Sequence, residues 1–140
     1  MWQRVEAIEN EPEPAATPGT RLPSLRGELL DALGRLVSRA LARSSDPRLR
    51  ESQGDALAQA AYALDGLVRE LVSAQASLES ERDGRILLNL VVETEHALAE
   101  VYGAGGGERA AALAVQLGVA TRTAFRPGGR IDWSRTRPSR

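Results

Sequence analysis

Apolar residues along most of the chain recur at steps of three and four, which is the spacing of helices with one buried face. The first such segment spans residues 24–44, and Ser24, which follows Pro23, is its expected N-cap. Pro47 disfavours helical geometry at Asp46, so the helix should end before that residue. The predicted buried stripe consists of Leu25, Leu29, Leu30, Leu33, Leu36, Val37, Ala40 and Leu41.

A second helix is predicted to begin near Asp46 and Pro47 or after Gly54, and to continue to about Asp83. Its apolar residues step alternately by four and three, which is the a/d repeat of a helix that packs at a shallow angle along another. The predicted assembly seam consists of Leu57, Ala61, Leu64, Val68, Leu71, Gln75 and Leu78. The polar Gln75 either fixes the register of this packing or lies at a wet edge.

Two further helices complete the pattern. Asp83 and Gly84 predict a helix stop and a tight turn, with Gly84 in the left-handed conformation. The third helix is expected over residues 85–102, antiparallel to the second because the connection is short. A glycine-rich loop then precedes a fourth helix over residues 108–125, in which Gly118 would let another helix approach closely.

These elements predict an all-α protein, an antiparallel bundle of about four helices over residues 21–126. Residues 1–20 are rich in proline and glutamate and form an acidic arm, and residues 127–140 open with Pro-Gly-Gly and form a basic tail. We expect both arms to be disordered or extended. No apolar run is long enough to span a bilayer, and the absence of cysteine fits a cytoplasmic protein.

Charge is unevenly distributed, although the formal net charge is only −1. Residues 51–108 carry eleven acids and three arginines, whereas residues 109–140 carry seven arginines and one acid. All eighteen basic residues are arginine. Either a GC-rich genome or selection for bidentate contact with phosphate or carboxylate accounts for that choice.

Arginine is therefore the main candidate for binding. Arg35, Arg39 and Arg43 recur every four residues along one face of the first helix, where they can meet phosphates or an acidic helix. In the tail, Trp133 and Ile131 accompany the arginines as apolar anchors. The residues predicted to bind an acidic partner or nucleic acid are Arg35, Arg39, Arg43, Arg126, Arg130, Trp133, Arg135, Arg137 and Arg140.

Catalytic chemistry has little support in the sequence. Glu93 and His96 form a Glu-x-x-His pattern that resembles one motif of the ferritin-like di-iron bundles, but the chain holds no second copy. With a single histidine there is no clear Ser-His-Asp arrangement, and the glycine-rich loop lacks the lysine of a phosphate-binding loop. We expect no enzyme activity, no cofactor and no metal site.

The favoured interpretation is a non-enzymatic helical-bundle assembly, adaptor or accessory protein, acting through contacts with a protein partner, with itself, or in a larger complex. The alternative is a nucleic-acid-associated subunit whose arginines contact the phosphate backbone. A ferritin-like metal-binding bundle is a remote third possibility. The sequence leaves the partner and the oligomeric state open.

Overall fold

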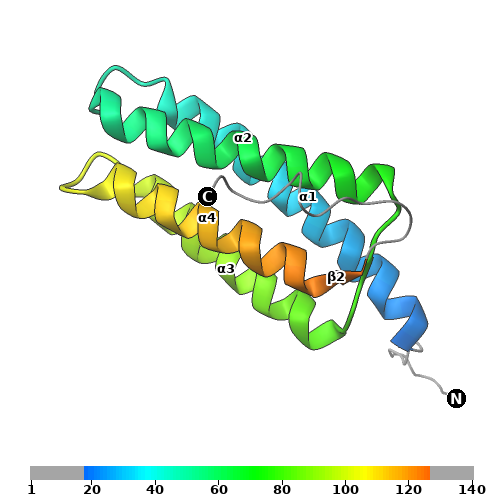
Figure 1. The fold of residues 1–140 in the computed structure, drawn as a ribbon. Coiled ribbons are helices and arrows are strands. Elements are labelled where there is room, and N and C mark those ends of the chain that lie inside the picture. The colour runs from blue at the N-terminus through cyan, green and yellow to red at the C-terminus, as the bar shows by residue number, and fades with distance from the viewer. Residues whose placement is uncertain (1–17, 127–140) are drawn as a thin grey trace, which may run out of the picture.

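The computed structural model describes residues 18–126, with side chains from Arg21 onward, and it is a bundle of four helices (Figure 1). The helices are α1 (Pro18–Ser44), α2 (Glu51–Ser73), α3 (Glu81–Ala99) and α4 (Gly106–Ala124). Helix α1 packs against α2 and α3, and α4 packs against the same two helices, so α1 and α4 occupy opposite corners. The all-α fold predicted from the sequence is confirmed.

Successive helices run in opposite directions, and the bundle therefore contains both antiparallel and parallel neighbours (Figure 1). The pairs α1–α2 and α3–α4 are antiparallel hairpins with short loops. In contrast, α1 and α3 lie side by side in the same direction, as two ion pairs show: Arg21 with Glu81 near their beginnings and Arg39 with Glu95 further along. Helices α2 and α4 form the second parallel pair.

Leucine and alanine form the core at the helical spacing that the sequence shows. Leu29, Leu57, Leu87 and Leu117, one from each helix, are at most 1% exposed. Each buried leucine contributes about 1.5–3 kcal/mol relative to an exposed one, so the stripes are the main force that holds the helices together. The buried Thr121 hydroxyl donates to the Leu117 carbonyl of its own helix at 2.7 Å, and so remains hydrogen-bonded.

The predicted end of the second helix near Asp83 is wrong, because α2 ends at Ser73. Gln75 adopts a left-handed conformation with φ 55°, and the N–H of Ala76 donates to the Leu71 carbonyl at 2.9 Å. This geometry closes the helix as a Schellman motif, with Ala76 and Leu71 both fully buried. The last two seam positions therefore lie outside α2.

The segment after α2 crosses to the other hairpin. Strand β1 (Ser77–Leu78) pairs antiparallel with β2 (Phe125–Arg126), which directly follows α4. Buried Leu78 opposes buried Phe125 in this ladder. The second and third helices therefore do not form the predicted hairpin; they occupy diagonal corners, joined by a connection that is pinned to the end of α4.

The predicted helix stop at Gly84 is also wrong, because Gly84 lies within the first turns of α3. The helix begins at Glu81 because the Ser80 hydroxyl accepts a hydrogen bond from the N–H of Asp83 at 3.1 Å. A β-carbon on Gly84 would lie 2.6 Å from Leu25 Cδ2. Glycine therefore serves close packing at this position rather than a turn.

The remaining boundaries differ less. Helix α1 begins at Pro18, so Ser24 is not its N-cap, and Pro23 lies inside the helix at the cost of one backbone hydrogen bond. Helix α4 begins at Gly106, after Gly105 with φ 70°. A β-carbon on Gly118 would lie 4.0 Å from a Leu64 methyl group, an ordinary contact, so the packing of α4 does not require glycine there.

Two glycines of α2 should respond oppositely to replacement by alanine. In Gly54→Ala the new β-carbon would lie 2.8 Å from the Ser44 carbonyl oxygen, a backbone atom that cannot rotate away. Such overpacking costs about 1–3 kcal/mol and outweighs the helix propensity that alanine gains. At Gly66 no side chain and no other segment lies within 4 Å of that position, so Gly66→Ala should stabilise the protein by about 0.5–1 kcal/mol.

Urea unfolding of the two variants and the native protein measures both effects. An increase in stability for Gly54→Ala as large as that for Gly66→Ala would contradict the close approach of α1 and α2 at this position.

Candidate protein-binding groove

Helix α4 has no charged residue between Ala110 and Thr121. One side of this uncharged stretch is nevertheless exposed, and Val115 and Val119 on it are each 47% exposed. Apart from the exposed Gln116, this stretch is apolar on all sides, and such a helix is normally buried on all sides. The outward side of α4 therefore has the composition of a covered surface.

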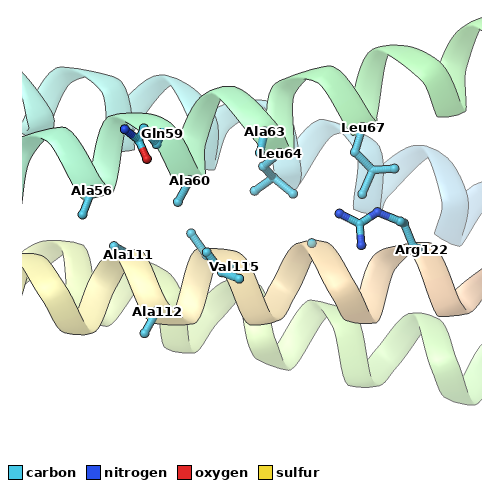
Figure 2. A pocket seen from close by; sticks show the side chains of 12 residues that line it. Ala56, Gln59, Ala60, Ala63, Leu64, Leu67, Ala111, Ala112, Val115 and Arg122 are labelled. Atoms are coloured by element: carbon cyan, nitrogen blue, oxygen red, sulfur yellow. The ribbon is translucent and has the colours of Figure 1, made fainter. Parts of the chain in front are cut away.

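A groove of about 390 Å³ runs between α2 and α4 beside these valines (Figure 2). Its lining is made largely of small apolar side chains. Helix α2 contributes Ala56, Ala60, Ala63 and Leu67, and α4 contributes Ala112 and Val115. Because methyl groups fill so little space, the groove has room for larger apolar side chains from another segment.

Polar groups lie toward the end of the groove formed by the last turns of α2 and α4. Figure 2 shows Arg122 of α4 extending into the space between the two helices. Glu70 of α2 follows Ala63 by seven residues, which places it on the same side of the helix. Its Oε2 atom is buried and accepts no hydrogen bond from the described residues, an arrangement that calls for a donor from elsewhere.

The arginine stripe of α1 lies on another part of the surface, next to α3. Arg39 donates to Glu95 at 2.6 Å, and the Arg43 guanidinium lies 5.9 Å from the centre of the Tyr102 ring. Arg35 is exposed. Two of the three predicted binding residues therefore contact groups of the chain itself.

A polar cluster joins the two loops at the far end of the bundle. Asp46 accepts hydrogen bonds from the Arg48 guanidinium at 2.9 Å and from the Tyr102 hydroxyl at 2.5 Å. Arg48 also lies over the Tyr102 ring, 4.2 Å from its centre. These hydrogen bonds hold the pKa of Asp46 well below its ordinary value. The bonds from Arg48 have the largest effect, and the bond from Tyr102 comes next.

Most residues of the predicted seam pack inside the bundle. Leu57, Ala61, Leu64 and Leu71 of α2 are buried and Val68 is partly buried. Gln75 is exposed in the turn after α2, and Leu78 is buried in β1.

Of the predicted tail residues, Arg126 alone is described, and it lies 3.5 Å from Glu79 across the β1–β2 ladder. The other tail positions, Arg130, Ile131, Trp133, Arg135, Arg137 and Arg140, lie outside the described residues.

Glu93 and His96 are both exposed on α3. Within residues 18–126, no three histidine or carboxylate side chains lie close enough to hold a metal ion. None of the helices in that range is long and apolar enough to cross a membrane.

Comparisons of the chain with protein-family models, with curated proteins and with solved structures found no match. The assignment of the groove as a candidate binding site therefore depends on its geometry alone. Sequence reasoning missed it, although the uncharged run from Ala110 to Thr121 was a visible signal. The contribution of α2 was not visible, because it depends on which helix lies beside α4.

The Asp46 cluster predicts a specific dependence of stability on pH. Since the folded-state pKa of Asp46 is lowered, its contribution is fully present above the ordinary aspartate pKa of about 3.9 and is lost as the pH falls below that value. The stability difference between the native protein and Asp46→Asn should thus be constant above about pH 5 and shrink on acidification. Urea unfolding at several pH values measures it.

Titration of the Asp46 carboxyl by NMR provides the control. Tyr102→Phe removes one of its donors and should raise the pKa of Asp46, while Arg48→Gln removes the larger contribution and should raise it further. An Asp46 that titrates in the native protein at the ordinary aspartate value would contradict the cluster.

Proposed function

We propose that this protein is a non-enzymatic assembly or accessory protein that binds a protein segment in the groove between α2 and α4. The observation that carries the proposal is the apolar groove, which includes the exposed Val115, with the exposed Val119 one turn further along α4. Contiguous exposed apolar surface of this kind marks protein interfaces. A role in assembly needs no catalytic group, and the groove is suited to binding rather than to reaction.

The groove favours an extended segment that carries large apolar side chains and arginine. Its alanine lining accommodates bulky side chains, and the buried Oε2 of Glu70 would accept a hydrogen bond from a guanidinium. Helix α2 carries four carboxylates and one arginine, so a basic segment beside it is favoured electrostatically.

Binding of nucleic acid has weaker support. Arg39 is paired with Glu95, so a phosphate would have to compete with that carboxylate, and the neighbouring acid would repel it. Arg43 is partly engaged by the Tyr102 ring. The surface around the α1 stripe is therefore mixed in charge rather than a basic track for a phosphate backbone.

Val115→Glu should weaken binding of the partner by about tenfold or more, because it places a charge in an apolar contact. The matched control is Val92→Glu on α3, whose valine is 53% exposed and lies away from the groove. The tagged full-length native protein is first purified from its own cells, and a protein that copurifies with it in stoichiometric amount is taken as the partner. The measurement is the amount of this protein recovered with each variant, at low and at high salt.

Equal partner recovery for the two variants would contradict the groove as the binding surface. A purified complex rich in 260 nm absorbance that is lost on Arg35→Ser and Arg39→Ser replacement would support the nucleic-acid alternative instead.

A further inference from the structure

We infer that the segment which fills the groove is residues 127–140 of the same chain, folded back along α2 and α4. This inference rests on the proposed function, since it takes the groove to be a site for a protein segment. It adds that the chain carries its own occupant, with which any external partner must compete.

The point at which the described chain ends makes this return path short. Strand β2 follows α4 directly, so Arg126 comes only four residues after Arg122, which lies at one end of the groove. Pro127, Gly128 and Gly129 come next and favour a reversal of direction. The groove from Ala111 to Arg122 is about 17 Å long at 1.5 Å per helical residue. Fourteen extended residues span up to about 46 Å.

The apolar residues of the segment match the lining of the groove. Ile131 and Trp133 are two positions apart, so both point to the same side of an extended segment, with Asp132 on the other. Large apolar side chains are unfavourable in water, and the space left by Ala60 and Ala63 beside Val115 offers them cover. The alternation thus suits a segment with one apolar edge lying in a shallow groove.

The charges of the segment also complement those of α2, and they indicate in which direction the segment runs along the groove. Residues 127–140 contain four arginines and one aspartate, opposite the acidic α2. Arg130 follows the turn closely, so it reaches the groove near the end of α2, where Glu70 lies. A guanidinium there would satisfy the buried Oε2 of that carboxylate. Ile131 and Trp133 then extend along the groove beyond it.

Occupancy within one molecule is favoured over exchange between two copies. A short linker of Pro-Gly-Gly holds the segment at an effective concentration in the millimolar range beside the groove. A second copy would have to reach comparable concentrations to compete. We therefore expect the groove of each monomer to hold the segment of its own chain.

The test follows the fluorescence of Trp133 in the full-length chain. The other tryptophan is Trp2, so Trp2→Phe leaves Trp133 as the single reporter. In this background Trp133 should emit at short wavelength and resist quenching by acrylamide. Val115→Glu and Glu70→Gln should each shift the emission to longer wavelength and increase the quenching.

Matched controls separate these effects from a general change in the surface. Val92→Glu adds the same charge on α3, and Asp65→Asn removes a carboxylate that pairs with Arg69 on its own helix. Neither should change the emission of Trp133. Circular dichroism confirms that all variants keep the native helix content.

A Trp133 that is as exposed in the parent protein as free tryptophan would overturn the inference. So would a shielded Trp133 that ignores both groove substitutions. Shielding that appears only at concentrations where light scattering shows a dimer would assign the groove to the segment of a second copy and overturn the intramolecular arrangement.

The proposed function and this inference fail in different ways. If Val115→Glu releases Trp133 but leaves partner recovery unchanged, the intramolecular segment stands and the proposed function falls. If partner recovery drops while Trp133 is exposed throughout, the proposed function stands and the inference falls.

Discussion

The arrangement of the whole bundle depends on how the chain crosses from α2 to α3. The left-handed Gln75 ends α2, and the hydrogen bond from Ala76 to Leu71 seals that end. The β1–β2 ladder then ties the crossing segment to the end of α4, and Ser80 starts α3. Short loops fix the two hairpins, but without this crossing the hairpins would have no fixed arrangement relative to each other, because leucine stripes pack well in more than one way. It is this arrangement that places α2 beside α4 and thereby creates the groove between them.

The chain satisfies many of its surface charges internally. Ion pairs such as Arg39 with Glu95 link α1 to α3, and the Asp46 cluster links the two loops at one end. Exposed pairs of this kind add little stability individually, but they occupy the charged groups on that side of the bundle. The groove between α2 and α4 differs, because small apolar side chains make up most of its lining and Arg122 lies at one end. The groove is thus an apolar strip on a surface that otherwise carries many charged side chains, those of α2 included.

The sequence was sufficient to predict the fold class and the buried stripes, because both follow from helical periodicity. It failed at the end of α2, where Leu78 continues the apolar spacing although the helix has already stopped. Nothing in a single glutamine signals a left-handed conformation, which costs about 1–2 kcal/mol and is imposed by the tertiary packing. The pair Arg39 and Glu95 was equally hidden, since the two residues are 56 positions apart. Only the α4 side of the groove could be recognised in the sequence, as an uncharged stretch. The sequence does not show that α2 lies beside it.

The β1–β2 ladder has a mechanical consequence. Because β2 follows α4 without a linker and pairs with β1, tension on the chain beyond Arg126 acts on this ladder as well as on the end of α4. Two short strands hold far less than four leucine-lined helices, so the ladder would yield first. Its release would free Leu78 from Phe125 and loosen the segment that sets the order of the helices. Force on the chain after Arg126 would therefore act on the connection between α2 and α3 through this ladder.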